Sequence, residues 1–522
     1  MADATAAAVT TARPTSVSRV WITVAIILAS MAAGALYTLA TGEDANWDWQ
    51  NYHDYNVWAL MHGRYGLDVA PAGFQTYFNP LVYFPVYWLR HALPAPLGLA
   101  IIGAVHGLNL ALIVWLMRRL LGQAVLPTMA AVAIAATGPM ALSETGTSFT
   151  DVVLSLPLIA AFGLILTGDH NGQSRRILLA GLLIGASVGL KLTSVVFALG
   201  AVVAVLLGAN PLGALMWLGL GGALGSVVTH GAWSAMLWRD LGNPIFPLFN
   251  GLFQSPELRS TNILDLQFLP RNAFDALAYP FYWLAGIPRS SEFVFRDARF
   301  AVVSLLVPIA IVIRILRGTP IFTRRDVQFF ALFGVSYAAW LQLFAIQRYA
   351  VVLELLCGPL IVLLIARLRP RWSSKASSVT MLAIAAAIAL WSQPGDWWRR
   401  PWSDPYRPEI PQVLQQPAIY MLLDKPMGYI APLLPPDSRF YQLADIALPI
   451  VPGGMFDKRI RDGLASPPPG GVWAMNARGT PINAALIARY ALVVDPTKPC
   501  VSIEGVVPNT AIAVCPLKAN TN

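Results

Sequence analysis

The sequence predicts an all-α polytopic membrane protein that carries a small extracytoplasmic α/β domain at its C-terminus. Three observations support this fold class: the composition, a series of long apolar runs, and a Pro-rich tail. Of the 522 residues, 56% are hydrophobic and only 12% are charged, and the mean hydropathy is +0.58. Soluble domains carry roughly 25% charged residues. A soluble fold could not cover this much apolar surface.

About eleven apolar runs have the length that a bilayer requires. The fifth and sixth are short and are separated only by Lys191, Leu192 and Thr193, so they could instead form one broken helix. The first run is longer than the roughly 7–15 apolar residues of a signal peptide, and we expect it to remain as a span. The runs lie near residues 18–40, 98–117, 124–142, 149–168, 177–190, 194–209, 212–236, 300–317, 327–346, 349–367 and 377–392.

The charged residues predict the orientation of this transmembrane region, residues 18–392. With the N-terminus inside, the inner loops contain a large excess of basic residues, as the positive-inside rule requires. They hold Arg13, Arg19, Arg118, Arg119, Arg175, Arg176, Arg314, Arg317, Arg324, Arg325, Arg367, Arg369, Arg371 and Lys375, against Asp3, Asp169 and Asp326. The net charge of +9 reflects these loops, and no motif indicates a nucleic-acid partner.

This orientation places three long segments outside: residues 41–97, residues 237–299, and a C-terminal domain over residues 393–522. It leaves residues 1–17 as a disordered cytoplasmic tail. The first outer segment has helical patterning over 46–63 and again near 79–92.

The C-terminal segment holds 20 of the chain's 40 prolines. Strand-like runs at 491–494 and 511–514 indicate a small mixed α/β domain. Cys500 and Cys515 would form a disulfide if this domain is outside, or else remain two buried thiols.

The first outer segment supplies a candidate catalytic carboxylate, Asp48, between two tryptophans. On a helix that begins near this residue, Asp48, Asn51, Tyr52 and Tyr55 would share one face. The amide and the two phenols on this face are candidate substrate-binding groups. A carboxylate there can accept a proton from an attacking hydroxyl. The alternative is that Asp48 simply caps the N-terminus of the helix.

The second outer loop places two further acids at the membrane surface: Asp151, a candidate catalytic residue, and Glu144, a candidate substrate-binding residue. A charge inside a bilayer costs up to about 3 kcal/mol, so such residues are usually functional or paired. Asp151 could alternatively be a helix cap.

Four basic or aromatic residues are candidates for binding an anionic group at the same surface: Lys191, Arg348, its neighbour Tyr349, and Arg271. Arginine suits phosphate because its planar guanidinium binds two oxygens at once. The alternatives are a lysine that extends to the membrane surface and an arginine in a solvated loop.

The three histidines of the first outer segment lack the spacing of a metal site. A divalent cation, magnesium or manganese, could still bridge Asp48, Asp151 and a phosphate. The sequence contains no phosphate-binding loop of an ATPase and no nucleophile elbow.

Taken together, these features resemble the C-type glycosyltransferase superfamily of polytopic membrane enzymes. The resemblance rests on Asp48 in a long first outer loop, Asp151 in the second, Arg348-Tyr349 at a late outer helix start, and a C-terminal outer domain. Bacterial aminoarabinose transferases and protein O-mannosyl transferases are similar.

The resemblance implies a sugar donor carried on a polyprenyl phosphate and an inverting transfer to a hydroxyl of a glycan, lipid or protein acceptor. It places this reaction at the outer face of the bacterial inner membrane. Asp48 would be the general base and Asp151 the second acid, while Lys191 and Arg348 would hold the phosphate.

Three other functions stay open: a transporter or flippase of a lipid-linked glycan, a glycan polymerase or ligase, and a non-catalytic assembly protein. A transporter would need charged groups midway along its helices. Here the charges lie mainly at helix ends, and only Glu354 lies clearly within a span. This distribution favours the enzyme.

Overall fold

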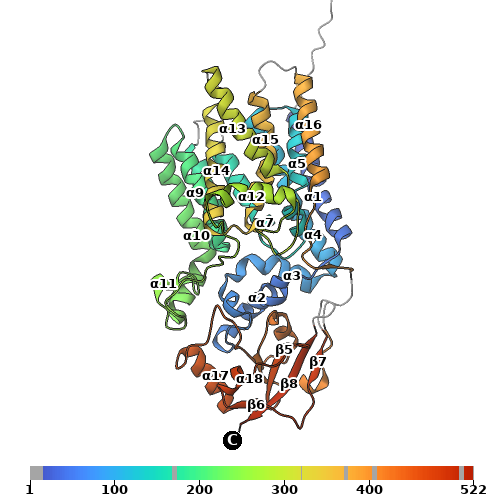
Figure 1. The fold of residues 1–522 in the computed structure, drawn as a ribbon, viewed down its shortest axis with the longest axis vertical. Helices are drawn as coiled ribbons and strands as arrows, with labels where there is room; N and C mark the ends of the chain where they lie inside the picture. Colours follow the sequence, from blue (N-terminus) through green and yellow to red (C-terminus); the bar gives the residue numbers. More distant parts are fainter. Residues whose placement is uncertain are drawn as a thin grey trace, which may run out of the picture.

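A helical bundle forms one end of the molecule and a sheet-containing C-terminal domain forms the other, with α2 (Asp54–Met61) and α3 (Phe84–Ala92) between them (Figure 1). The computed structural model describes residues 16–166, 173–318, 320–368, 374–402, 408–504 and 511–520. Outside these ranges lie residues 1–15 of the predicted tail and the loop residues Asp3, Arg13, Asp169, Arg369 and Arg371.

Every predicted span coincides with a helix of the bundle. These are α1 (Ser16–Thr41), α4 (Ala95–Leu121), α5 (Val125–Ala136), α7 (Asp151–Ile165), α8 (Gln173–Leu190), α9 (Val195–Leu206), α10 (Pro211–Leu241), α13 (Arg299–Arg317), α14 (Arg324–Leu343), α15 (Val351–Leu368) and α16 (Ser374–Trp391). Within the described ranges, five helices are long and apolar enough to cross a membrane, and four more are shorter apolar helices. The fold is therefore that of a multi-pass membrane protein, while the number of crossings and the side of the N-terminus remain predictions.

The two short runs around Lys191 are separate helices rather than one broken helix. Helix α8 packs along α10, whereas α9 packs along α14. The approach of α8 to α10 depends on small residues, because a Cβ added at Gly185 would lie 2.0 Å from the carbonyl oxygen of Gly222. Near the end of α9, the Ala204 carbonyl accepts a 2.8 Å hydrogen bond from Gln328 at the start of α14. The chain therefore turns back at Lys191.

Basic residues of the predicted inner loops gather at one end of the bundle. Arg325 donates to the Arg119 carbonyl at 2.8 Å, and Arg317 donates to the Leu368 carbonyl at 3.2 Å. Arg367 pairs with Asp326 at 2.9 Å. These contacts join the C-terminal ends of α4, α13 and α15 to the start of α14, and we call this region the basic end.

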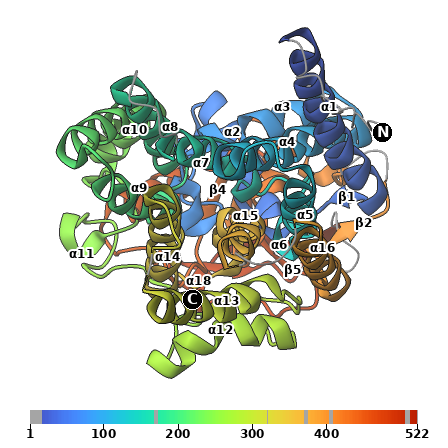
Figure 2. The same ribbon diagram turned by 90° about the horizontal axis from the view of Figure 1, so that it is seen from above.

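Helix α15 occupies the centre of the bundle, next to α5, α13, α14 and α16 (Figure 2). Every residue from Val351 to Ile365 is buried. The short helix η6 (Gln347–Ala350) leads directly into α15. The position of Arg348 and Tyr349 is therefore fixed by the most buried helix of the protein.

The first outer segment is helical, as predicted over 46–63 and 79–92. It contains β1 (Glu43–Asp44), the π-helix η1 (Trp49–His53), α2, η2 (Arg64–Gly66), η3 (Gly73–Tyr77), η4 (Pro80–Tyr83) and α3. The other loops contain α6 (Pro139–Glu144), η5 (Leu192–Ser194), α11 (Asn250–Phe253) and α12 (Ala273–Ala285).

The C-terminal domain is a small mixed α/β unit, as predicted. Its elements are β2 (Arg399–Arg400), η7 (Gln412–Leu414), β3 (Ile419–Leu422), η8 (Gly428–Leu433), β4 (Arg439–Gln442), α17 (Met455–Ala465), β5 (Val472–Ala477), α18 (Ala484–Ala488), β6 (Leu492–Val494), β7 (Val501–Ile503) and β8 (Ile512–Ala519). The sheet order is β4-β3-β5-β8-β6, with β7 also paired to β8. Strand β3 is parallel to β4 and β5, whereas β8 is antiparallel to its partners. Cys500 and Cys515 form the predicted disulfide.

The first outer segment is attached to this sheet. The Val69 amide donates to the Phe440 carbonyl at 2.9 Å, and the Gln442 amide donates to the Val69 carbonyl at 2.9 Å. A Cβ added at Gly428 would lie only 2.0 Å from the carbonyl oxygen of Asn51. The C-terminal domain therefore covers η1 directly and helps to fix the residues that precede it.

Candidate functional site

Four charged residues from distant parts of the chain come together at the end of the bundle that faces the C-terminal domain. Asp48 directly precedes η1, and Asp151 is the first residue of α7. Lys191 lies between α8 and η5, and Arg348 lies in η6. They form two ion pairs, so the structure brings together the two acids and two of the cations that the sequence singled out.

Asp48 pairs with Arg348, with 2.5 Å between Oδ2 and Nη1. The Tyr52 hydroxyl lies 3.3 Å from the same carboxylate oxygen. The side chain of Asp48 does not cap the helix, because the Trp49 amide donates to Oδ1 of Asn46 at 2.7 Å instead. The alternative role as a side-chain cap is therefore wrong. The helix that follows is a π-helix, a conformation often found at functional sites.

Asp151 pairs with Lys191, whose ammonium lies 2.7 Å from both carboxylate oxygens. The same ammonium lies 4.7 Å from the centre of the Tyr349 ring. The guanidinium of Arg348 lies 5.3 Å from that ring. Tyr349 therefore contacts both cations, at distances typical of cation–π interactions, and couples the two ion pairs into one cluster.

The electrostatics keep Asp48 ionised beside a neutral histidine. Burial raises the pKa of Asp48, but the positive charge of Arg348, the hydrogen bond that Arg348 donates and the other nearby basic groups together hold the pKa below its ordinary value. His53 is buried nearby, and burial lowers its pKa to about 3. Its Nδ1 lies 2.9 Å from the Ser148 hydroxyl, and its ring stacks on Tyr83. The imidazole is therefore neutral at pH 7.

Glu144 is fully buried, and neither of its carboxyl oxygens has a hydrogen-bond partner within the described part of the chain. Burial raises the pKa of Glu144 well above its ordinary value, and the negative charge of Asp151 raises it further. This carboxyl group therefore holds its proton more tightly than an ordinary glutamate does.

A cavity of about 370 Å³ lies beside the ion pairs, within the usual size range of ligand pockets. Tyr52, Lys191, Arg348 and Tyr349 line it, whereas Asp48 and the other paired carboxylate do not. The cations therefore face the cavity, and each has its carboxylate partner behind it. Such an arrangement is suited to an anionic ligand.

Several residues of this cavity were not singled out from the sequence. Asn79, Tyr83 and His230 line it. The side-chain amide of Asn79 donates to the Gly189 carbonyl at 2.9 Å and to the Thr229 carbonyl at 2.8 Å. It therefore holds the first outer segment against the end of α8 and the C-terminal half of α10. Ser226 and Ser234 lie four residues before and after His230 and also line the cavity, so a polar helical face marks His230 in the sequence. No such spacing marks Asn79 and Tyr83.

Four of the predicted substrate-binding residues do not line the cavity: Asn51, Tyr55, Glu144 and Arg271. The Asn51 side chain donates to the Ala72 carbonyl at 3.1 Å, and the Tyr55 hydroxyl donates to Asp68 at 2.8 Å. The expectation that both share a face with Asp48 is wrong, because the wider π-turn over η1 changes the angle between successive side chains. Arg271 is exposed in the loop just before α12 and does not line the cavity.

The donor set does not fit a tightly bound magnesium or manganese ion. Across the described residues, no group of three or more His, Cys, Asp or Glu side chains is arranged to hold a metal. Asp48 and Asp151 each already have a cationic partner. A metal ion would have to displace both side-chain cations to bridge the two carboxylates.

Comparison with known proteins finds a family similarity for the central part of the chain. Residues 77–270 match the family model of Glycosyltransferase family 87. This is a C-type family, so the resemblance seen in the sequence is confirmed over this segment. No curated protein matches the chain. The chain is similar to a solved structure, that of ArnT from Cupriavidus metallidurans bound to undecaprenyl phosphate. The two sequences are 15% identical, and the TM-score of the two structures is 0.47. The match covers 72% of this chain and 64% of the length of ArnT.

The segment that matches Glycosyltransferase family 87 builds much of the site. It contains Asp151 and Lys191, together with the cavity residues Asn79, Tyr83 and His230. Asp48 precedes the matched segment and Arg348 follows it. The site therefore combines the family-matched region with residues from both flanks.

Proposed function

We propose that this chain is a membrane glycosyltransferase that moves a sugar from a polyprenyl-phosphate donor to an acceptor hydroxyl. The observation that carries this proposal is the pair of cations, Lys191 and Arg348, that line one cavity with Tyr349 between them. Two cations so close together suit the phosphate of a donor, and Glycosyltransferase family 87 supplies the class of reaction.

The walls of the cavity favour a donor with a lipid tail. Val227 of α10 lines the cavity and is also 66% exposed on the outside of that helix. The cavity thus reaches the apolar surface of a predicted span. A phosphate held by Lys191 and Arg348 could keep its prenyl chain in the bilayer through this side of the site.

The same geometry supports a role for Asp48 as general base. In the resting site its carboxylate is held by Arg348, at 2.5 Å. When a donor phosphate binds Arg348, it competes with this carboxylate and leaves Asp48 free to accept a proton. Tyr52, 3.3 Å away, keeps the carboxylate oriented.

The proposed reaction is a single inverting displacement. The acceptor oxygen forms a bond to the anomeric carbon while the bond from that carbon to the phosphate oxygen breaks. The hydroxyl proton passes to Asp48, which contributes about 10²–10⁴-fold to the rate. Lys191 and Arg348 stabilise the charge on the departing polyprenyl phosphate. Asp151 positions Lys191 through the contacts to both of its oxygens.

We place this reaction at the outer face of the bacterial inner membrane. The site lies away from the basic end, where Arg119, Arg317, Arg325 and Arg367 gather. Positive residues mark the cytoplasmic side of a membrane protein. The acceptor would approach from the aqueous side, next to the C-terminal domain.

The test is reconstitution of the purified protein in liposomes with a panel of polyprenyl-phosphate sugars and a panel of glycan, lipid and peptide acceptors that carry hydroxyl groups, followed by mass spectrometry of the lipids and acceptors. A transferase releases free polyprenyl phosphate, whereas a flippase would move the donor intact. Arg348→Gln should raise the donor KM and lower kcat. The matched control is Arg289→Gln, because Arg289 pairs with Asp275 in an outer segment and does not line the cavity. Transport of intact donor, or no effect of Arg348→Gln, would refute the proposal.

A further inference from the structure

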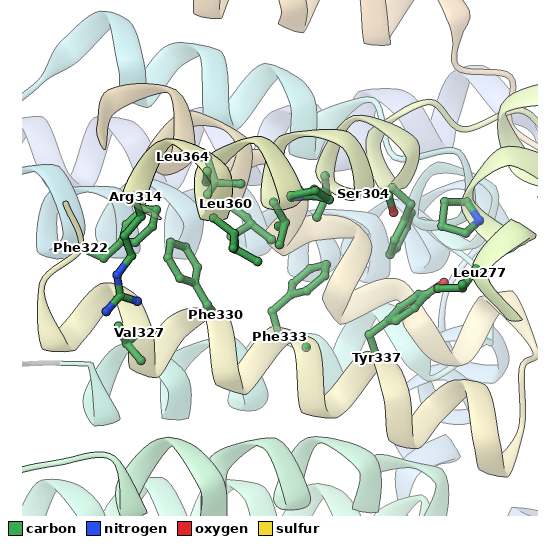
Figure 3. Close-up of a pocket in the computed structure, with 18 of the residues that line it drawn as sticks. Leu277, Ser304, Arg314, Phe322, Val327, Phe330, Phe333, Tyr337, Leu360 and Leu364 are labelled. Carbon is green, nitrogen blue, oxygen red and sulfur yellow. The ribbon is translucent and has the colours of Figure 1, made fainter. Parts of the chain in front are cut away.

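A second cavity, separate from the candidate site, runs between α13 and α14. It has a volume of about 610 Å³ and shares no lining residue with the site cavity. Figure 3 shows Arg314 near one end of it and Leu277 and Tyr337 near the other. Leu277, Ile311 and Ile315 are more than half exposed, so the cavity is an open groove on the outside of the bundle. We call it the α13–α14 groove.

The walls and the length of the groove suit an acyl chain. Phenylalanines, leucines and valines make up most of its lining, including Phe330, Phe333 and Leu360. Along α13 it extends from Phe300 to Arg314, about 21 Å at 1.5 Å per residue. One leaflet contributes about half of the roughly 30 Å hydrocarbon core of a bilayer. The groove is therefore long enough for one lipid chain that lies along the helices.

The end of the groove at the basic end carries uncompensated positive charge. Arg314 lines it, and Arg324 lies between two other lining residues at the start of α14. Neither arginine has an ion-pair or hydrogen-bond partner among the residues that the structure describes. The nearby acid, Asp326, is already bound by Arg367 and by the amide of Thr323. An apolar groove that ends at free guanidinium groups matches a lipid with an anionic headgroup.

We propose that the α13–α14 groove binds an anionic phospholipid, with one acyl chain along the groove and the headgroup phosphate at Arg314. Basic pockets between helices at the cytoplasmic side are known to hold anionic headgroups. The headgroup end of this groove lies at the opposite end of the bundle from the candidate active site, and the proposal does not rest on the enzymatic activity.

The groove offers a substitution that fills it with little local strain. Gly334 of α14 lines the groove, and a Cβ added there meets no atom within 4 Å. Gly334→Trp should therefore occupy the space of the acyl chain. Gly219 on α10 is a matched control, since it is also exposed and a Cβ added there also meets no atom within 4 Å. For the headgroup, Arg314→Gln is compared with Arg175→Gln, an exposed arginine on α8 outside the groove.

The experiment is native mass spectrometry of the full-length protein in neutral detergent, with phosphatidylglycerol and phosphatidylcholine of identical acyl chains added in equal amounts. We expect the unaltered protein to retain phosphatidylglycerol in preference to phosphatidylcholine. Arg314→Gln should lower that preference about fivefold, the effect of one arginine near a lipid headgroup. Gly334→Trp should remove one bound lipid. Arg175→Gln and Gly219→Trp should match the unaltered protein.

Three results would overturn the proposal. The first is equal retention of the two lipids. The second is an undiminished number of bound lipids in Gly334→Trp. The third is displacement of phosphatidylglycerol by added polyprenyl monophosphate in the unaltered protein but not in Gly334→Trp, because the groove would then hold the prenyl chain instead. Circular dichroism of each variant confirms that the helices are intact, so a loss of binding is not confused with unfolding.

Discussion

Replacement of Asp48 by Asn tests the central part of the proposed mechanism. The change keeps the size of the side chain and removes the charge that binds Arg348 across 2.5 Å. The two side chains are only 11% and 15% exposed. Breaking a buried ion pair from one side costs about 3–5 kcal/mol. Since Arg348 borders a cavity that can hold water, we expect a cost at or below the lower end of that range, and the variant should fold.

The effects of Asp48→Asn on binding and on catalysis should differ in sign. Sugar transfer should fall by about 10²–10⁴, the usual contribution of a general base. Binding of polyprenyl phosphate should stay the same or become tighter, because Arg348 no longer has to leave a carboxylate. Transfer is followed by product analysis of the lipids, and binding by titration of polyprenyl phosphate into the purified protein.

The control for this experiment is Asp54→Asn, which removes a carboxylate of the same outer segment that pairs with His91 at 2.9 Å. It should leave transfer within a few-fold of the original rate. Transfer by Asp48→Asn at a similar level would show that Asp48 is not the base. A parallel loss of polyprenyl-phosphate binding would show that Asp48 acts in binding rather than in proton transfer.

Three further predictions concern stability. The folded protein holds the Glu144 proton to a higher pH than the unfolded chain does. The contribution of this proton to the free energy of unfolding is therefore complete below about pH 4.3 and is lost as pH rises through the folded-state pKa. Glu144→Gln should lessen the resulting decline of Tm with pH. Gly428→Ala should destabilise the packing of the C-terminal domain by about 1–3 kcal/mol, since the new Cβ would lie 2.0 Å from the Asn51 carbonyl, and limited proteolysis should show faster cleavage. Reduction of Cys500–Cys515, which closes a loop of 15 residues, should cost about 3 kcal/mol in thermal unfolding.

Each of these predictions has a control in the same chain. Glu292→Gln changes an exposed acid and should leave the pH dependence of Tm unchanged. Gly66→Ala adds a Cβ that meets no atom within 4 Å, so rapid proteolysis of this variant too would contradict the packing argument. The Cys500→Ser variant should be as unstable without reductant as the original protein is with it. If reductant destabilises Cys500→Ser further, the buried thiol Cys357 must be involved.

The arrangement of helices could be predicted from the sequence because hydropathy marks each apolar run directly. Lys191 and Arg348 stood out for the same reason, as charges at the ends of such runs. The face of the helix around Asp48 could not be predicted from a regular period of 3.6 residues, because η1 is a π-helix. This error moved Asn51 and Tyr55 into the predicted site.

The rest of the cavity depends on contacts between residues far apart in the chain. Asn79 joins the first outer segment to α8 and α10 across more than 100 positions. His230 lies on an apolar helix with Ser226 and Ser234 four residues before and after it, so the sequence does mark a polar face there. Nothing in a single sequence reveals the contacts of Asn79, so its place in the site could be found only from the fold.

The placement of Asp48 and Asp151 behind the two cations has a consequence for selectivity. Exposed guanidinium and ammonium groups at a bilayer surface would attract the headgroup of any passing phospholipid. Here each cation already has an internal anion, so an incoming ligand gains only the difference between its own contacts and those of the carboxylate. Headgroups that bind no better than a carboxylate would be turned away. A ligand that also fills the aromatic cavity would have the extra free energy needed to displace both acids.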